Sequence, residues 1–303
     1  MKSRIVRHYL EHLAFKAFSG AAIFLPELLA LCAGSLLGWI AGSVLRVRRT
    51  EVDEHLLLAF PERTEAWRHN VARASYAHLG REAVATLRLS RGTDKELIER
   101  IHIPDLALFR TAVEAGRGVI LVTGHLGNWE VGGGAFTSRG IALDAIVKGM
   151  TNQAIGDAIT RVRQRLGIGL IHMNEAARKV PRSLLQGRVV AIPADQNAHK
   201  GGTFISFFGR VASTTRAPAV FAIRTGAPVF LGIALRDPGW GQRYTVSLER
   251  IDFKTTGEVD ADVRGLTAAH SAALERAVRA APEQYFWQHR RWKRTPGLDD
   301  VAC

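Results

Sequence analysis

Cysteine is nearly absent from this 303-residue sequence, which has only Cys32 and Cys303. One lies in an apolar segment and the other is the last residue, which argues against a disulfide framework and against a cysteine metal cluster. The sequence therefore favours a reducing compartment. From Val52 onward there is also no internal repeat and no low-complexity tract, so neither a repeat protein nor a second flexible linker is expected.

Acidic residues are scarce relative to basic ones. There are 41 Lys and Arg against 28 Asp and Glu, which gives a net charge of +13 and a pI near 10.5. This charge favours an anionic partner: phospholipid, phosphorylated substrate, acidic protein or nucleic acid. No helix-turn-helix, zinc or RNA-binding signature supports nucleic acid, so we expect no nucleic-acid partner. The length and the 47% hydrophobic content are sufficient for a full core.

Charge is missing altogether from residues 28–45. This length is borderline for a membrane span, and Pro26 and Glu27 interrupt the apolar pattern before it. We expect residues 1–49 to form a helical membrane-associating segment: a tilted span, a re-entrant helix or a helix in the interface. A buried core helix of a soluble domain is the alternative, and a secretory signal is not expected because no A-x-A-like site follows. Basic residues flank the segment on both sides, namely Lys2, Arg4, Arg7, Lys16, Arg46, Arg48 and Arg49.

Residues 50–303 are expected to form one catalytic-sized domain of the α/β class, with a mostly parallel central sheet flanked by helices. Short β-rich runs alternate there with stretches of helical periodicity, which is typical of that class. Helical spacing broken near residue 60 predicts two or three helices before residue 89. The expected strands are 118–124, 143–149, 169–173, 188–194 and 227–235, with a late edge strand at 242–253; the expected helices begin after 128 and cover 152–166, 174–186, 215–225 and 260–281.

Two polar segments follow strands of this predicted sheet. One is "GHLGNWE" (124–130) and the other is "ADQN" (194–197). Ligands of open α/β sheets bind outside the carboxyl ends of the strands. If the two strands are parallel neighbours, His125, Glu130 and Asp195 should therefore converge on one crevice.

The spacing of His125 and Glu130, across a turn into a helix, permits a hydrogen bond between imidazole and carboxylate. Such a carboxylate fixes the tautomer of the imidazole, which can then take a proton from an alcohol at neutral pH. The segment contains no Ser or Cys, so the nucleophile would be the hydroxyl of the substrate. A surface histidine and a helix-capping glutamate are the structural alternative. No second histidine stands at helical spacing, so we expect no metal.

Five segments together resemble the bacterial lipid A biosynthesis acyltransferases, the lauroyl and myristoyl transferases of the glycerolipid acyltransferase superfamily. The resemblance runs from about residue 35 to 296. It rests on "HLGNWE" (125–130), "RVRQRLG" (161–167), "AIPADQNAHKGGTFISFFGRVASTT" (191–215), "RTGAPVF" (224–230) and "PEQYFWQHRRWK" (282–293).

The resemblance implies that His125 is the general base and Glu130 the carboxylate that orients it. Asp195 stands where the family has a D-x-D/N stretch and would support the active site or the acceptor. The family often continues with Tyr-Gly-Pro, whereas residues 195–200 read "DQNAHK". The acceptor can therefore differ from a lipid A precursor.

Arg163 corresponds to a family arginine that binds phosphate or stabilises the oxyanion, and Arg161 and Arg165 are close alternatives in the same segment. Attack on a thioester carbonyl builds negative charge, which a fixed cation stabilises by a few kcal/mol. A solvated helix face is the structural alternative for each of these arginines.

The aromatic run at 204–208 offers a second set of candidates. Phe204, Phe207 and Phe208 would line an acyl-chain groove, with the hydroxyls of 213–215 starting a helix near the site. Core packing followed by a helix cap is the alternative. The final "HRRWKR" (289–294) would place cations beside aromatics at a membrane face or a phosphate-bearing substrate.

The sequence and the resemblance together predict a membrane-associated O-acyltransferase at the cytoplasmic face of a bacterial inner membrane. It would move a fatty acyl group from an acyl carrier protein or CoA to a hydroxyl of an anionic membrane glycolipid, such as a lipid A precursor. The thioester is a co-substrate and no cofactor is expected. Alternative acceptors are phosphatidylinositol mannoside and a lysophospholipid. A thioester hydrolase and a non-catalytic protein that binds anionic lipid or nucleic acid also remain open.

Overall fold

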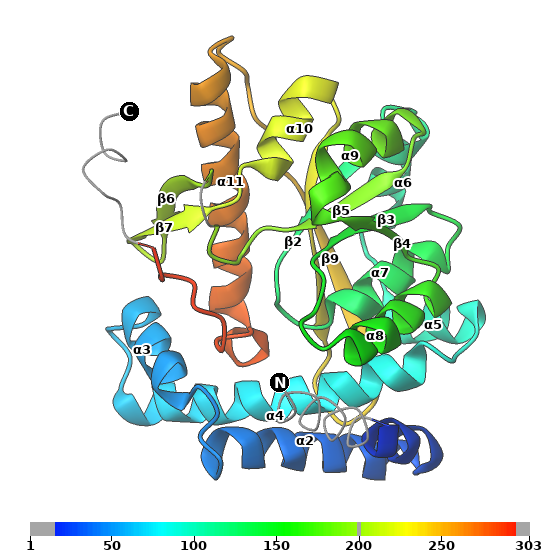
Figure 1. The fold of residues 1–303 in the computed structure, drawn as a ribbon, viewed down its shortest axis with the longest axis vertical. Helices are drawn as coiled ribbons and strands as arrows, with labels where there is room; N and C mark the ends of the chain where they lie inside the picture. The colour runs from blue at the N-terminus through cyan, green and yellow to red at the C-terminus, as the bar shows by residue number, and fades with distance from the viewer. Residues whose placement is uncertain (1–15, 199–200, 295–303) are drawn as a thin grey trace.

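The computed structural model describes residues 16–198 and 201–294, so Cys303 and the basic residues Lys2, Arg4 and Arg7 lie outside the described part (Figure 1). The helices are α2 (Glu27–Ser43), α3 (Arg49–Ala59), α4 (Glu65–Leu89), α5 (Asp94–Arg100), α6 (Leu106–Glu114), α7 (Trp129–Thr137), α8 (Gln153–Arg165), α9 (Ala176–Leu185), α10 (Ala217–Thr225) and α11 (Val259–Ala280), with short 3-10 turns η1 (Met173–Glu175) and η2 (Pro282–Gln284). The strands are β1 (Ile101–His102), β2 (Val119–Thr123), β3 (Leu143–Val147), β4 (Gly169–His172), β5 (Val189–Pro193), β6 (Thr203–Phe207), β7 (Arg210–Thr214), β8 (Val229–Arg236) and β9 (Tyr244–Arg250).

The central sheet has the order β1-β9-β8-β2-β5-β3-β4. Its neighbouring strands pair in parallel, apart from the antiparallel pair β8–β9. The predicted α/β class and mostly parallel sheet are therefore confirmed. The prediction that β9 is an edge strand is wrong, because the two-residue strand β1 pairs with its residues Tyr244 and Thr245.

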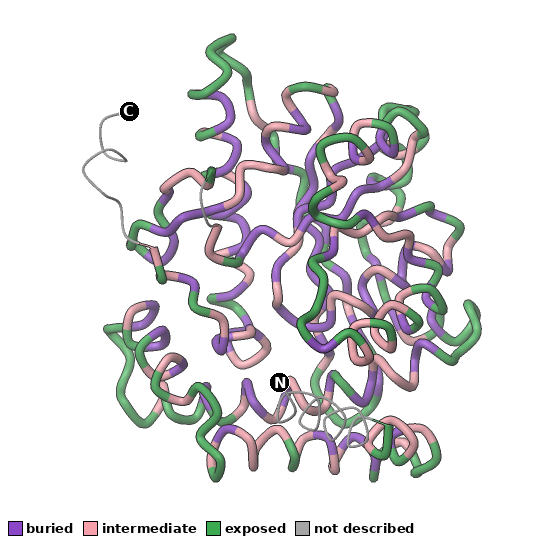
Figure 2. Tube along the Cα trace, viewed as in Figure 1, coloured by how far each residue is buried: buried purple, intermediate pink, exposed green. Residues whose placement is uncertain are grey.

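Helices cover both faces of the sheet, and the strands bury both faces (Figures 1 and 2). In β2, Ile120 and Val122 join one core with α3, α10 and α11, whereas Val119 and Leu121 join a second core with α6, α7 and α8. Alternate residues of a strand point to opposite faces, so a strand covered twice has apolar residues at every position. This is why the parallel strands are continuous apolar runs in the sequence.

The apolar N-terminal helix α2 lies along α4 at the base of the molecule (Figure 1). Glycines let the two backbones approach: a Cβ on Gly38 would lie 2.0 Å from the Tyr76 carbonyl oxygen, and one on Gly80 would lie 2.1 Å from that of Gly34. The small residues of α2 therefore serve close helix packing. Among the helices of the described residues, none is both long and apolar enough to cross a bilayer, so the predicted span is not found there.

A buried histidine in α11 leads to a prediction about acid stability. His270 is fully buried, and neither ring nitrogen has a hydrogen-bond partner in the described part of the chain. Burial lowers the pKa of His270 from 6.5 to about 3. The unfolded chain therefore binds a proton between these pH values and the folded chain does not. Stability should fall as the pH drops through this window, by up to about 1.4 kcal/mol per pH unit from this group.

Replacing His270 with leucine removes this titration, so the decline below pH 6.5 should be shallower than in the wild type. Chemical denaturation at several pH values measures the difference. The matched control is His69→Leu on the exposed face of α4, which should leave the slope unchanged. Parallel pH profiles for the wild type and His270→Leu would contradict the assignment.

Candidate active site

His125 and Asp195 come from adjacent parallel strands and form the centre of the candidate site. β2 pairs with β5 in parallel, and each residue lies two positions beyond its strand. His125 Nδ1 donates to Asp195 Oδ1 at 2.8 Å, and the backbone N–H of His125 donates to Asp195 Oδ2 at 2.7 Å. The side chain of Asp195 is 3% exposed and that of His125 is 19% exposed. The expected meeting of the two segments at the sheet edge is confirmed.

Their pairing shifts both pKa values. Burial alone would lower the pKa of His125, but the charge and the hydrogen bond of Asp195 outweigh burial, so this pKa lies above its usual 6.5. Burial would raise the pKa of Asp195, and the contacts with His125 lower it below its usual value instead. The result is an ionised carboxylate that holds the proton of His125 on Nδ1 and leaves Nε2 able to accept a proton.

Glu130 has a different partner from the one that the sequence motif predicted. Its carboxylate accepts hydrogen bonds from Arg163 Nε at 2.9 Å and Arg163 Nη2 at 2.6 Å, and from Trp129 Nε1 at 3.2 Å. The carboxylate hydrogen-bonded to His125 is that of Asp195. The predicted hydrogen bond between His125 and Glu130 is therefore wrong. Glu130 lies in the first turn of α7, where its side chain is directed toward α8 and Arg163.

Nε2, the second ring nitrogen of His125, contacts a side chain that follows β5. Gln196 Nε2 lies 3.3 Å from His125 Nε2, and the side chain of Gln196 is exposed. His289 accepts a hydrogen bond on Nε2 from the backbone N–H of Asn197 at 2.9 Å, and burial lowers the pKa of His289 to about 4. His289 is therefore neutral near pH 7 and keeps its proton on Nδ1.

The backbone of the motif is held from two sides. The backbone N–H of Asn128 donates to the Ala234 carbonyl of β8 at 2.8 Å, and the Phe286 N–H donates to the His125 carbonyl at 2.9 Å. Gly127 has a φ of +66°, and a Cβ there would lie 2.0 Å from the Ala234 carbonyl oxygen. Glycine is required at 127 because only its backbone fits both the conformation and the contact.

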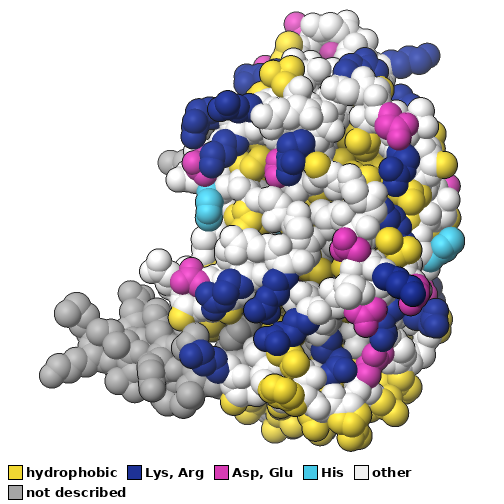
Figure 3. Space-filling model, turned by 90° about the vertical axis from the view of Figure 1, so that its right-hand side faces the viewer, with side chains coloured by type: hydrophobic (Ala, Val, Ile, Leu, Met, Phe, Trp, Pro, Cys, Tyr) yellow, Lys and Arg dark blue, Asp and Glu magenta, His cyan; other side chains and the backbone are white. Residues whose placement is uncertain are grey.

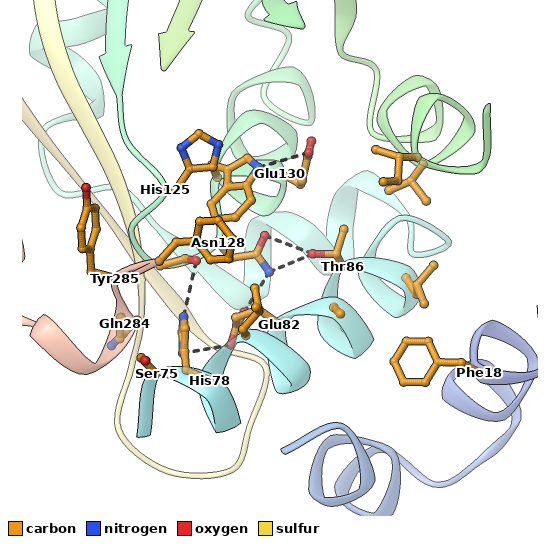
Figure 4. Close-up of a pocket in the computed structure, with 18 residues that line it drawn as sticks. Phe18, Ser75, His78, Glu82, Thr86, His125, Asn128, Glu130, Gln284 and Tyr285 are labelled. Carbon is orange, nitrogen blue, oxygen red and sulfur yellow. Dashed lines mark hydrogen bonds and ion pairs between the residues drawn. The ribbon is translucent and has the colours of Figure 1, made fainter. Parts of the chain in front are cut away.

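A buried polar network supports the first turn of α7 from below (Figure 4). Glu82 of α4 accepts hydrogen bonds from Asn128 Nδ2 at 2.8 Å and from the Tyr244 hydroxyl at 2.7 Å, and it pairs with Arg236 of β8. Asn128 in turn accepts the backbone N–H of Val131 at 3.0 Å, which caps α7. The network joins α4, the sheet and the turn that follows His125 through buried groups that are hydrogen-bonded to one another.

Two cavities meet at His125, and His125, Trp129 and Glu130 line both of them. The smaller one, of about 220 Å³, has a largely apolar wall and lies between α4, α8 and the motif (Figure 4). The larger one, of about 680 Å³, lies over the carboxyl ends of β2, β3 and β5, and its polar lining residues include Arg163, Gln196, Asn197 and His289. The indole of Trp129 packs edge-on against the His125 imidazole, with ring centroids 4.7 Å apart, at this junction.

The three arginines of α8 are separated by the structure. Arg163 lines the larger cavity, whereas Arg161 and Arg165 are exposed and line neither cavity. Helical geometry explains the difference, since residues two apart point about 200° apart around the axis.

Phe204, Phe207 and Phe208, the predicted acyl groove, line neither of these two cavities. They belong to the β6–β7 hairpin, where Phe207 and Phe208 are buried in the core beside α11, and the guanidinium of Arg294 lies 5.1 Å from the Phe204 ring. Phe207 and Phe208 are therefore core residues, packed between the hairpin and α11.

The hydroxyl residues 213–215 lie in and just after β7. Thr215 lines the larger cavity, and its Oγ1 accepts the backbone N–H of Ala217, the first residue of α10, so for Thr215 the prediction of a hydroxyl at a helix start near the site is confirmed.

The C-terminal basic segment is also partly structural. Arg291 is 2% exposed and donates to the Ser213 carbonyl at 2.7 Å and to Thr214 Oγ1 at 2.6 Å. Arg290 pairs with Glu51 of α3 at 2.6 Å. These two arginines therefore connect the segment to the domain.

Across residues 16–198 and 201–294, no cluster of three or more His, Cys, Asp or Glu side chains is arranged to hold a metal ion. Sequence reasoning missed Trp129, Gln196 and His289 as site residues. The first two stand inside the quoted motifs. His289 stands in the quoted C-terminal segment 282–293, but nothing in that segment indicates that it lies near His125.

Comparison with known proteins identifies the family. The description "bacterial lipid A biosynthesis acyltransferase" belongs to a family profile that matches residues 1–294. The chain is 26% identical over 277 residues to the lipid A biosynthesis palmitoleoyltransferase of Escherichia coli K12, which covers 90% of this chain and 87% of that protein. It is 23% identical over 265 residues to the lauroyltransferase of the same organism, with 87% and 85% covered.

A relative with a different named acceptor matches over a shorter stretch. The phosphatidylinositol mannoside acyltransferase of Mycolicibacterium smegmatis is 25% identical over 206 residues. The match covers 66% of this chain and 66% of that relative, just under two thirds of each. The resemblance seen in the sequence motifs is confirmed by the family match across nearly the whole length. The chain therefore belongs to the bacterial lipid A biosynthesis acyltransferase family and is an acyltransferase.

Proposed function

We propose that this protein transfers a fatty acyl group from an acyl thioester to a hydroxyl of a membrane glycolipid, with His125 as the general base. One observation carries the proposal: His125, whose Nδ1 is held by buried Asp195, lies where an apolar cavity meets a larger cavity that also has polar and charged lining residues. An acyl chain suits the first cavity and a polar headgroup suits the second.

The reaction needs two proton transfers at His125. Nε2 takes the proton of the acceptor hydroxyl while the oxygen attacks the thioester carbonyl and forms a new C–O bond. The tetrahedral oxyanion collapses, the C–S bond breaks, and the imidazolium returns its proton to the leaving thiolate. Asp195 stabilises the imidazolium in between. Gln196, 3.3 Å from Nε2, would move aside or orient the incoming hydroxyl.

The oxyanion and the phosphates of the substrates require donors in the larger cavity. Arg163 is our candidate, because its guanidinium lines this cavity while Glu130 holds its orientation. The Glu130–Arg163 pair then acts as one preorganised unit. The role of Glu130 is to position Arg163, while Asp195 orients the base.

The donor and acceptor are proposed by class. The donor is an acyl carrier protein or CoA thioester, and the net charge of +13 favours either anionic donor. The relatives act, by their names, on lipid A or on phosphatidylinositol mannoside, so a glycolipid is the proposed acceptor. Mass spectrometry of lipids from cells with and without this chain tests the class. One acyl-sized mass difference on a glycolipid is expected, and release of free fatty acid without acylated lipid would indicate a hydrolase instead.

We further propose that the protein lies on the cytoplasmic face of the inner membrane, with α2 in the interface. Leu28, Leu29, Leu36 and Leu37 of α2 are each more than half exposed. Figure 3 shows hydrophobic side chains gathered at the same end of the molecule, with basic side chains above them. An exposed apolar stripe beside cations is typical of a helix that lies in a membrane surface.

This membrane arrangement predicts that Leu36→Gln combined with Leu37→Gln weakens binding to phosphatidylethanolamine vesicles containing phosphatidylglycerol by about tenfold or more, because both side chains lose apolar burial. Sedimentation with vesicles measures it. Leu185→Gln on α9, where the leucine is also exposed, is the matched control and should bind as the wild type does. Equal binding by the double variant and the control would refute the proposed α2 interface.

A further inference from the structure

The apolar cavity has two different ends. At one end Ser75 and His78 of α4 lie near Gln284, and these side chains are polar (Figure 4). At the other end lie Phe18 and Leu87. The hydrocarbon tail of a substrate is more stable against the apolar end, because there it leaves water without covering polar groups.

The floor of the cavity is one face of α4. Its lining residues recur at three- and four-residue spacing from Ser75 to Leu87, which is the spacing of neighbours on a helix surface. At 1.5 Å per residue this face is about 18 Å long, the scale of an extended fatty acyl chain. A fatty acyl chain lying along the axis of α4 would therefore match the length of this face.

Ala83 is the smallest side chain in the apolar part of this face. It lies one turn from Leu79 and one turn from Leu87, so it leaves a notch between two larger side chains. Ala83 is exposed rather than buried in the core. A larger residue at 83 would therefore fill cavity space without displacing core side chains.

Phe18 closes the same end from the opposite side. It lies in the helical residues 16–24, and Arg88 Nη1 ties that segment to α4 through the carbonyls of Ala22 and Leu25, both at 2.8 Å. The Phe18 ring is therefore held next to the Leu87 end of the α4 face that lines the cavity, where the tail of an acyl chain would end.

We propose that Ala83 and Phe18 set the length of the acyl chain that this cavity accepts, Ala83 by the notch it leaves and Phe18 by the wall it forms. The inference rests on the proposed acyl transfer, because it assigns the tail of the same substrate to this cavity. Chain length is then selected by the fit of the tail between α4 and the 16–24 helix.

The test uses Ala83→Leu, Phe18→Ala and a matched control, Ala66→Leu, on an exposed residue of α4 that lines neither cavity. Binding of saturated fatty acids from decanoic to stearic acid is measured by calorimetry, which needs no catalysis. Ala83→Leu should move the tightest-binding acid about two to four carbons shorter, because leucine adds three side-chain carbons to the cavity. Phe18→Ala should move it longer, and the control should match the wild type.

Acyl transfer from the corresponding acyl-CoA series to lipids extracted from the host cell gives the second readout. An unchanged length preference in folded Ala83→Leu, in both binding and transfer, would overturn the inference. A shifted binding preference with no acylated lipid from any variant would overturn the proposed function and leave the chain-length assignment standing. A shift in the Ala66→Leu control would show that the effect does not come from the cavity, and would also overturn the inference.

Discussion

Replacing His125 with alanine is expected to lower the rate of acyl transfer about a thousandfold or more, the usual contribution of a positioned general base. Nε2 would be lost, and no other imidazole of the described residues is held by a carboxylate beside both cavities. Purified variants assayed with acyl-CoA and extracted lipid measure the effect. Alanine would also leave the buried Asp195 without its side-chain partner, so His125→Asn, which can still donate to Asp195, is the second variant.

Thermal melting separates loss of catalysis from loss of fold, and His172→Ala, an exposed histidine at the end of β4, is the matched control. The wild-type rate should fall at acid pH because a protonated imidazole cannot accept a proton. Since the pKa of His125 is raised, this acid limb should lie above the usual 6.5. Near-normal turnover of a folded His125 variant would remove the general base from the proposed reaction.

Asp195→Asn is expected to reduce kcat by about a hundredfold or more while the protein stays folded. The directions of two hydrogen bonds explain this loss. One oxygen of Asp195 accepts the backbone N–H of His125 and the other accepts its Nδ1–H. A backbone N–H can only donate, so the amide oxygen of asparagine must face it and the NH2 group must face Nδ1. The imidazole proton is then forced onto Nε2, and the base is lost.

Glu130→Gln is the isosteric comparison, since Glu130 bonds Arg163 and Trp129. It should lower activity less than Asp195→Asn. Both changes remove a charge that raises the pKa of His125, but Asp195 contributes more than Glu130, so Asp195→Asn should move the acid limb further to lower pH than Glu130→Gln does. The reverse ranking, with Glu130→Gln the more damaging and the one that moves the limb further, would restore Glu130 as the carboxylate that orients His125.

Much of the fold follows from local patterns. The apolar runs of β2 and β5 and the helical spacing of α8 and α11 predicted their elements within a few residues, because a doubly covered parallel strand and an amphipathic helix have distinct periods. The hairpin β6–β7 was missed, since its aromatic run resembles a lipid-binding surface as well as a core. The strand β1 was missed because a strand of two residues is too short to show an alternating pattern of apolar and polar residues.

The site was predicted less completely. The motif predicted that His125 stands at the carboxyl end of a strand, and the order of strands brought Asp195 beside it. The choice between two carboxylates depends on side-chain direction: Glu130 is on a helix that points it toward Arg163. The apolar cavity was not predicted from the sequence because its walls come from α4, α8 and residues 284–286, which lie far apart in the sequence.

Composition, periodicity and the ordered motifs predicted the α/β class, the net basic charge, an apolar N-terminal helix and a histidine at a strand end, and the resemblance carried by the motifs predicted an acyltransferase. These properties depend on residues that are close together in the sequence, so they can be predicted without a structure. Which carboxylate holds the imidazole, which arginine lines the larger cavity and which helix face lines the apolar cavity were decided by contacts between residues tens of positions apart. Such contacts depend on the direction of each side chain across the packed helices and strands, which only folding sets.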